Sequence, residues 1–334
     1  MGLGMPKVLV TGGAGYVGHV LVPALLAEEC DVTVYDTFWF GDRLPDSARL
    51  TRVRADIRDP DHVEEAARGC DAVINLACIS NDTSFALDEK LSTSINLNAF
   101  APMVRACERA GVKRFVNAST SSVYGVSEAP EVFEDHPKVP LTYYNRYKWE
   151  CEEILTKLDP DFEWVTLRPA TVCGYSPRCR LDLSVNILTN HAVNRGTITV
   201  FGGTQKRPNL HIGDMVDAYL MLLSTDGGKI DRRTYNCGFQ NLSIMEIATL
   251  VKDTVERVFP EKAPIHISVT DSDDKRSYHI NSDRIRRELG FEPRRTIADA
   301  VRDLCEAFRH NLLPGSFDDH NYYNVRKLQT LAVS

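Results

Sequence analysis

Short apolar runs alternate with amphipathic stretches through the first half of this 334-residue chain. The apolar runs predict β-strands near residues 7–11, 31–35, 51–55, 71–76, 114–118 and 162–168. Further along the chain, the pattern predicts a short strand at 197–201 and a helix at 213–223. Strands that alternate with helices pair in parallel, because each helix returns the chain to the same end of the sheet. The pattern therefore predicts an α/β fold built on a doubly wound parallel sheet.

The first predicted strand runs into a turn with three glycines, and an amphipathic stretch that predicts a helix follows. Gly12 allows a tight turn, Gly15 lets a phosphate approach the backbone, and Gly18 brings helix and strand close together. The N–H groups at the start of such a helix attract phosphate. The turn predicts a dinucleotide site that includes Gly12, Gly15, Tyr16 and Val17, although a glycine-rich turn without a ligand is an alternative at this point.

The ends of the next three strands carry residues that suit the rest of a dinucleotide. Asp36 ends the second strand, where an acid hydrogen-bonds the adenosine ribose hydroxyls and repels a 2′-phosphate, so NAD is favoured over NADP. Asp56 and Ile57 follow the third strand, beside the expected adenine. Leu76 and Ala77 follow the fourth, beside the expected ribose and nicotinamide. Ligands gather at the carboxyl ends of parallel strands, so we expect these residues to share one site.

The strand and helix rhythm loosens in the second half of the chain. We predict that residues 5–175 form a Rossmann-type NAD-binding domain, to which residues 207–240 return. Residues 176–206 and 241–330 are expected to form a smaller mixed lobe that binds the substrate.

The composition is that of an ordinary soluble protein, with 43% hydrophobic and 25% charged residues and a net charge of −7. This charge argues against a nucleic-acid partner. No apolar stretch approaches eighteen residues and no signal sequence is evident, so we expect a cytoplasmic protein without a membrane partner. The nine cysteines lack CxxC spacing and the histidines form no ligand pairs, which predicts reduced structural thiols and no metal site.

A tyrosine and a lysine, Tyr144 and Lys148, stand four residues apart and so share one face of a predicted helix. A free tyrosine has a pKa near ~10, but a nearby ammonium and a positive nicotinamide both favour the phenolate. Tyr144 is therefore a candidate general base. The fifth predicted strand delivers Thr120 to the same edge of the sheet.

Taken in order, these motifs resemble the extended short-chain dehydrogenase/reductase family, in its branch of NAD-dependent nucleotide-sugar epimerases and dehydratases. The resemblance runs nearly end to end. It implies that Thr120 hydrogen-bonds the reacting sugar hydroxyl and that Tyr144 removes its proton. It also implies that Lys148 binds the nicotinamide ribose and lowers the pKa of Tyr144, so Tyr144 and Lys148 belong to the cofactor site as well.

The same resemblance implies a nucleotide-diphosphate sugar as substrate. It places Asn186 and Arg276 near the diphosphate and Arg207 near the nucleotide, and arginine suits phosphate because its planar fork gives paired bonds. Residues 78–82 and 176–182 depart from the usual epimerase pattern and are expected to add polar groups to the sugar pocket. The predicted substrate-binding residues are Ser80, Asn81, Asp82, Thr120, Ser121, Asn186, Arg207 and Arg276.

The departures in these two runs raise the hypothesis of a modified or larger sugar, such as a heptose or deoxysugar of surface-polysaccharide assembly. Cys173 and His211 fall close to this region. We interpret both as structural residues rather than as catalysts.

Three outcomes are possible for the keto-sugar that the first step would form. A 4,6-dehydratase of this family has Asp-Glu directly after the threonine, and this chain has Ser121 and Ser122, which disfavours dehydration. Hydride return to the opposite face would make the protein a C4 epimerase, which is our prediction. Release of the ketone would make it a hexose or heptose C4-dehydrogenase, and the sequence barely separates these two. A non-catalytic NAD-binding regulator is disfavoured by the intact Thr120, Tyr144 and Lys148.

Relatives in this family often dimerise through two helices, so the resemblance implies a homodimer through residues 93–110 and 144–157. The segment at 321–326 has no explanation from the sequence.

Overall fold

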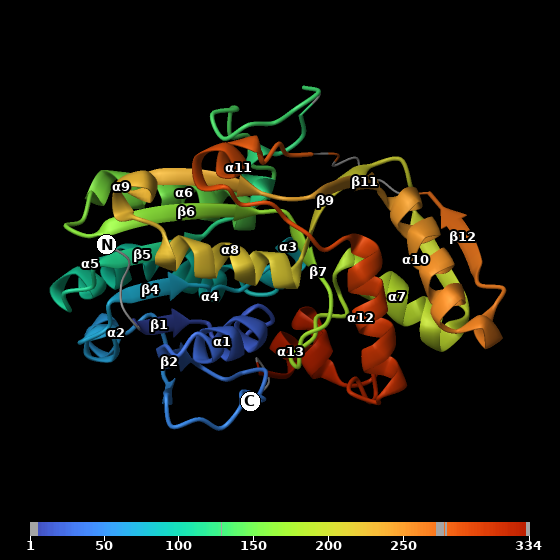
Figure 1. Ribbon diagram of the computed structural model, residues 1–334, viewed down its shortest axis with the longest axis horizontal. Coiled ribbons are helices and arrows are strands. Elements are labelled where there is room, and N and C mark those ends of the chain that lie inside the picture. The colour runs from blue at the N-terminus through green and yellow to red at the C-terminus, as the bar shows by residue number, and fades with distance from the viewer. Residues whose placement is uncertain (1–5, 128, 272–276, 278, 332–334) are drawn as a thin grey trace.

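The computed structural model describes residues 6–127, 129–271, 277 and 279–331 (Figure 1). Seven parallel strands form the central sheet in the order β10-β6-β5-β4-β1-β2-β3. Their bounds are β1 Lys7–Thr11, β2 Asp31–Asp36, β3 Leu50–Arg54, β4 Ala72–Asn75, β5 Arg114–Ala118, β6 Glu163–Pro169 and β10 Arg233–Cys237. The predicted doubly wound parallel sheet is confirmed, and each of the six strands predicted for the first half lies within two residues of its expected bounds.

The strand order reverses beside β1, since β2 and β3 lie on one side of it and β4, β5 and β6 on the other. The connections on the two sides leave in opposite directions, which opens a crevice at the carboxyl ends of β1 and β4. This is where the predicted site residues converge. The seventh strand, β10, was not predicted, because its sequence Arg-Thr-Tyr-Asn-Cys lacks an apolar run.

Helices cover both faces of the sheet, so alternate residues of one strand enter different cores. Val8 and Val10 pack with α1 and α8 on one face, whereas Leu9 packs with α2, α5 and α6 on the other. Figure 1 shows α1 and α8 side by side in front of the sheet. The helices of this part are α1 Gly18–Ala27, α2 Pro60–Ala67, α3 Asp82–Phe85, α4 Glu89–Thr93, α5 Phe100–Arg109, α6 Tyr143–Leu158, α8 Ile212–Ser224, α9 Gly227–Ile230 and α11 Asp283–Leu289.

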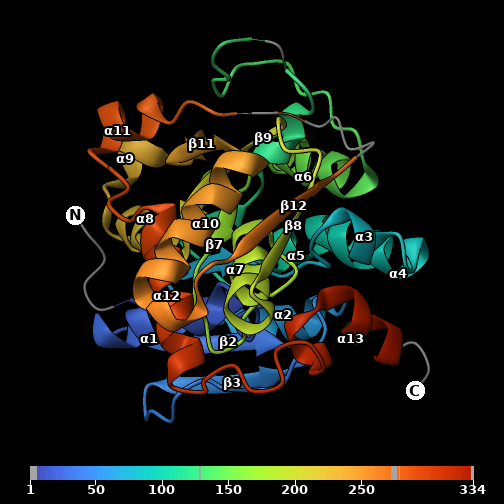
Figure 2. The ribbon, with the colours of Figure 1, turned by 90° about the vertical axis from the view of Figure 1, so that its right-hand side faces the viewer.

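A second group of elements packs around its own apolar core, to the right of the sheet in Figure 1 and facing the viewer in Figure 2. This core draws on residues such as Val185, Val200, Val251 and Val301. The elements are α7 Ser184–Arg195, β8 Thr197–Phe201, α10 Ile244–Val258, β12 His266–Thr270 and α12 Ile297–Arg309. A three-stranded sheet connects the two groups, made of β7 Thr171–Cys173, β9 Lys206–His211 and β11 Gln240–Ser243. The strand predicted at 197–201 is confirmed, and the proposed domain boundaries stay a prediction.

One helix predicted to run over 93–110 is interrupted. The π-helical turn η1, Ser94–Asn98, separates α4 from α5. Within it the Asn96 side chain bonds both backbone groups of Ile79, and the Asn96 carbonyl accepts the thiol of Cys151 at 3.1 Å. The turn thus ties the segment after β4 to α6. The predicted homodimer through these helices stays a prediction.

The remaining described elements are the 3₁₀ turns η2 Ser121–Tyr124, η3 Pro260–Lys262 and η4 His320–Tyr322, and the C-terminal helix α13 Asn324–Leu331. No helix in the described part of the chain is both long and apolar enough to span a membrane.

A buried ion pair lies under the carboxyl end of β5. Arg168 of β6 and Glu152 of α6 meet at 2.6 Å, with side chains only 5% and 8% exposed. Glu152 also accepts the hydroxyl of Ser119, and Arg168 donates to the Tyr124 hydroxyl at 2.7 Å. Through Ser119 and Tyr124 the pair fixes both sides of the segment that carries Thr120.

We expect Glu152→Ala to lower the free energy of unfolding by about 3–5 kcal/mol, because it leaves a buried guanidinium without its counter-ion. Urea denaturation followed by circular dichroism measures this loss. Glu150→Ala is the matched control on the same helix, since its partner Arg146 is 58% exposed and the pair is solvated. Equal losses in the two variants would contradict the role given to the buried pair.

Candidate active site

The glycine-rich turn between β1 and α1 makes a close backbone contact with the segment after β4. Gly12 has a φ of +71°, and a Cβ there would lie 2.7 Å from the backbone of Ala77. At Gly15 the only atom that an added Cβ would meet within 4 Å is the carbonyl oxygen of Gly12. No described side chain caps the start of α1. The turn therefore presents open backbone at a helix N-terminus, which suits an anionic ligand.

Asp36 stands where β2 ends and is held by this turn. Its carboxylate accepts the N–H of Ala14 at 3.0 Å and the N–H of Phe38 at 2.7 Å. Burial raises the pKa of Asp36 above its ordinary value, and the two backbone N–H groups oppose that shift. Both bonds fix the direction of the carboxylate.

A single cavity runs along the carboxyl ends of β1, β2, β4 and β5. All of the predicted cofactor-binding residues line it: Gly12, Gly15, Tyr16, Val17, Asp36, Asp56, Ile57, Leu76, Ala77, Tyr144 and Lys148. Thr120, Ser80 and Asn81 line it too. Residues that are far apart in the sequence thus meet at one edge of the sheet.

Tyr144 and Lys148 lie in the first two turns of α6. The helix begins where Thr142 accepts the N–H of Asn145 at 3.3 Å, and the ammonium of Lys148 donates to the carbonyl of Ala118 at 2.7 Å. That bond anchors Lys148 to β5, two residues before Thr120. The base candidate and the hydroxyl candidate are therefore fixed to neighbouring elements.

A second cavity adjoins the first, because Asn81, Thr171 and Leu183 line both. Most of the residues that line it have polar side chains, and they include two carboxylates, Asp82 and Asp182, and the guanidinium of Arg207. The residues that line only this cavity are Asp82, Thr83, Ser122, Gly125, Leu141, Asn145, Asp182, Ser184 and Arg207. In the sequence, Ser122 and Asn145 are close neighbours of Thr120 and Tyr144, so the cavities adjoin near the candidate catalytic residues.

The model of the NAD dependent epimerase/dehydratase family matches residues 8–238. The chain belongs to this family. It is therefore an enzyme of the family, and its cofactor is NAD.

Similar proteins cover about nine tenths of this chain. A UDP-glucose 4-epimerase from Azospirillum brasilense is 28% identical over 323 residues, which cover 89% of this chain and 90% of that protein. The solved UDP-glucose 4-epimerase of Thermus thermophilus, in complex with NAD, is 25% identical with a TM-score of 0.79 and covers 91% of this chain and 99% of its own. MoeE5, solved with UDP-glucose and NAD, is 27% identical with a TM-score of 0.78 and covers 92% of this chain and 99% of its own.

The cavity fits the family cofactor. Gly15 leaves room for a diphosphate against the backbone, and the Asp36 carboxylate is positioned to accept ribose hydroxyls. Residues Ile57, Leu76 and Ala77 supply apolar surface for the rings. In the described residues no cluster of three or more His, Cys, Asp or Glu side chains is arranged to hold a metal ion.

Two predicted substrate residues do not reach either cavity. Asn186 is fully buried, and its amide group is used within the protein: it donates to the Tyr16 hydroxyl and the Arg180 carbonyl and accepts the N–H of Gly174. Ser121 is 1% exposed and lines neither cavity. Asn186 therefore holds residues that line or adjoin the cavity in place, and its own side chain does not face either cavity.

The other predicted substrate residues are placed as follows. Ser80 and Asn81 lie at the cofactor cavity, and Asn81, Asp82 and Arg207 lie at the second one. Arg276 lies outside the described residues.

Sequence reasoning missed several residues of the cofactor cavity. These are Trp39, Phe40, Arg178, Arg180, Asn324 and Leu328. Residues 176–182 were expected to add polar groups to the sugar pocket. The structure places Arg178 and Arg180 in the cavity along the carboxyl ends of the strands, together with the predicted cofactor-binding residues. Asn324 carries no local signal, because only the tertiary fold brings it there.

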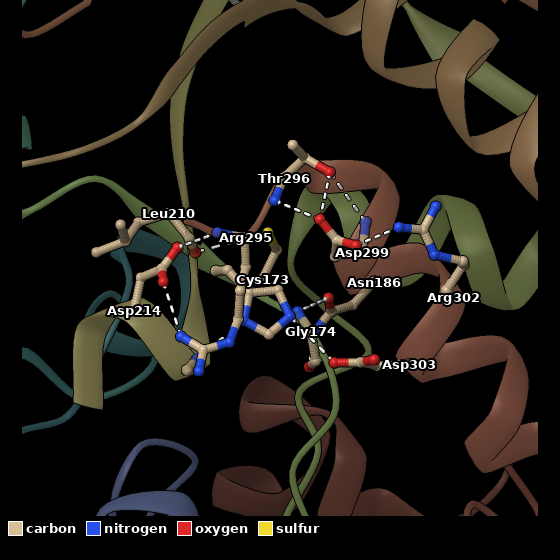
Figure 3. A network of polar contacts seen from close by, with 12 residues as sticks. Cys173, Gly174, Asn186, Leu210, Asp214, Arg295, Thr296, Asp299, Arg302 and Asp303 are labelled. Atoms are coloured by element: carbon tan, nitrogen blue, oxygen red, sulfur yellow. Dashed lines mark hydrogen bonds and ion pairs between the residues drawn. The ribbon is translucent and has the colours of Figure 1, made fainter. Parts of the chain in front are cut away.

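Cys173 and His211 lie in a structural network behind the cavities, part of which Figure 3 shows. The thiol of Cys173 is buried against the carbonyl of Leu210, and burial raises the pKa of Cys173. His211 accepts the N–H of Gly213 and contacts Asp303 at 3.1 Å. Neither residue lines either of the two cavities described above, which agrees with their interpretation as structural residues.

We expect Asp36→Asn to weaken NAD⁺ binding about 10- to 100-fold, since hydrogen bonds to a charged acceptor are among the strong ones. The wild-type affinity should also fall on acidification, beginning above the ordinary Asp range, because burial raises the pKa of Asp36 and protonation removes the negative charge of the acceptor. Isothermal titration of the apoprotein across pH measures both effects. An unchanged affinity in the variant would contradict the role of Asp36.

Proposed function

We propose that this protein is an NAD-dependent nucleotide-sugar 4-epimerase. One observation carries the proposal: Thr120, Tyr144 and Lys148 line the same cavity as the glycine-rich turn, and a polar cavity large enough to continue the site adjoins them. The curated relatives reported above include a UDP-glucose 4-epimerase, which supports a nucleotide sugar as substrate.

In the proposed reaction the sugar ring lies between the two cavities. The Thr120 hydroxyl hydrogen-bonds the C4 hydroxyl, and the Tyr144 phenolate removes the proton from its oxygen. Lys148 stabilises the phenolate electrostatically. When bound, the cofactor would supply the acceptor for the C4 hydride in its oxidised form and, after the ketone has turned, the donor that returns the hydride to the opposite face in its reduced form. Tyr144 then gives the proton back, so the sugar is isomerised without net oxidation.

The residues after Thr120 support epimerisation over 4,6-dehydration. Elimination across C5–C6 needs a group that takes a carbon-bound proton and one that protonates the departing hydroxide. The two residues in that place are Ser121 and Ser122, and Ser121 is buried away from both cavities. Neither hydroxyl suits those tasks.

The lining of the second cavity bears on the sugar. It holds Asp82, Asp182 and Arg207 among amide and hydroxyl groups, which suits a hydroxyl-rich sugar. We keep the modified hexose or heptose of surface-polysaccharide biosynthesis as the proposed class, together with a cytoplasmic homodimer as the working form.

The test is a panel of UDP-, GDP-, dTDP- and CDP-sugars offered to the NAD-loaded protein, with the NADH absorbance and the product's NMR spectrum as readouts. An inverted sugar without lasting NADH is expected. Lasting, stoichiometric NADH with a keto-sugar would replace the proposal by a C4-dehydrogenase.

We expect Tyr144→Phe to lower the turnover by about 10²- to 10⁴-fold, because it removes the general base and keeps the ring. The neighbouring Tyr143→Phe is the matched control, since Tyr143 is 52% exposed and lines neither cavity. Retained turnover in Tyr144→Phe would contradict the catalytic role of Tyr144.

A further inference from the structure

The segment that follows β7 is attached to the glycine-rich turn. Ser176 donates its hydroxyl to the carbonyl of Tyr16 at 2.8 Å, and Arg43 donates to the carbonyl of Pro177 at 2.8 Å. Arg178 comes next and lines the cofactor cavity. The two hydrogen bonds made by Ser176 and Pro177 therefore hold Arg178 between the start of α1 and the loop after β2.

Arg178 is buried without an ionic partner. It is 3% exposed, and its guanidinium lies 3.8 Å from the ring centre of Phe40. One of its terminal nitrogens donates to the amide oxygen of Asn324 at 2.5 Å, and Asn324 in turn donates to the hydroxyl of Ser80 at 2.9 Å. The Nε of Arg178 has no hydrogen-bond partner among the described atoms, and no ion pair forms with this side chain in that part of the structure.

Burying the guanidinium of Arg178 in this way costs free energy unless an anion binds it. A guanidinium taken out of water needs a counter-ion or a full set of acceptors, and Arg178 has a neutral amide and an aromatic ring. Burial, followed by repulsion from Arg180, lowers the pKa of Arg178 to about 9. Asp182 and Asp36 oppose that shift. The charged form is still less stable in this site than in water, and a negative ligand would stabilise it.

The other cations of the cavity are already paired. Among the described residues that line it, the positive side chains are Lys148, Arg178 and Arg180. Lys148 is bound to the carbonyl of Ala118, and Arg180 forms a two-bond pair with Asp182. Among these three cations, Arg178 is therefore the one whose Nε has no hydrogen-bond acceptor among the described residues.

We propose that Arg178 binds the diphosphate of the dinucleotide beside the start of α1, with Asn324 and Phe40 holding its guanidinium in place. The diphosphate is the anionic group that the turn and Asp36 bracket, since the turn receives phosphate and Asp36 receives the adenosine ribose. The proposal concerns cofactor binding and is independent of the sugar reaction.

The test measures binding rather than turnover. Apoprotein and Arg178→Gln are titrated calorimetrically with NAD⁺, ADP, NADP⁺ and adenosine. We expect Arg178→Gln to weaken NAD⁺ and ADP by about 10- to 100-fold and to leave adenosine unchanged, because charge-assisted bonds to phosphate are lost and contacts to the base and ribose are kept.

A second variant keeps the test decisive if Arg178→Gln does not fold. Asn324→Asp places a carboxylate on the guanidinium and satisfies its charge from within, so NAD⁺ binding should weaken by about tenfold while Arg178 is still present. Arg49→Gln is the matched control, because Arg49 is an arginine of the same connection between β2 and β3 whose side chain is 42% exposed and does not line the cavity, and this variant should bind NAD⁺ as the wild type does.

The other outcomes overturn the proposal. Equal weakening of adenosine and NAD⁺ would show that Arg178 only orders the cavity. Selective loss of NADP⁺ binding would assign Arg178 to a 2′-phosphate. Unchanged NAD⁺ binding in both Arg178→Gln and Asn324→Asp would remove the residue from the cofactor site.

Discussion

The arrangement of the site depends on the backbone contact between Gly12 and Ala77, where the ends of β1 and β4 meet at the reversal of the strand order. A side chain at position 12 would collide with the main chain of its neighbour, so only glycine lets the turn fold down over β4. That contact brings the turn, Asp36 and the segment after β4 to one edge. The crevice, the open helix N-terminus and the cavity all follow from it.

The first half of the fold was predictable because its signals are local. Buried parallel strands show as continuous apolar runs, and Gly12, Gly15 and Asp36 mark their turns without reference to the rest of the chain. Strand β10 escaped prediction because its polar residues are satisfied by tertiary contacts, such as the hydrogen bond from the Tyr124 hydroxyl to the Asn236 side chain. The hydrophobic pattern within a short stretch of sequence does not show a contact between residues 112 positions apart.

The candidate site divides in the same way. Tyr144 and Lys148 were identifiable from a spacing of four on one helix, and Thr120 from its place after a strand. Asn186 was expected near the substrate from the resemblance, but its amide is used to hold Tyr16, Gly174 and Arg180. Arg178 was expected in the sugar pocket, and its contact with Asn324 became visible only with the tertiary structure, because the two residues lie 146 positions apart.

The two cavities share more than a boundary. Asn81 lines both and donates to Asp182, which pairs with Arg180, and Arg180 donates to the hydroxyl of Ser80. Electrostatic contact with Tyr144 extends this network to the candidate base. The same set of polar contacts thus lies along the walls of both cavities.

The hydrogen bond between Asn324 and Ser80 has a consequence for folding. It joins residues 244 positions apart, and contacts of such long range form late, after the entropy of closing the loop has been overcome. A chain whose central sheet has formed but whose α13 has not docked would contain the glycine-rich turn. It would lack the contacts of Asn324 with Arg178 and Ser80. If Arg178 binds the diphosphate as proposed, full affinity for the dinucleotide requires that α13 has docked on the rest of the chain.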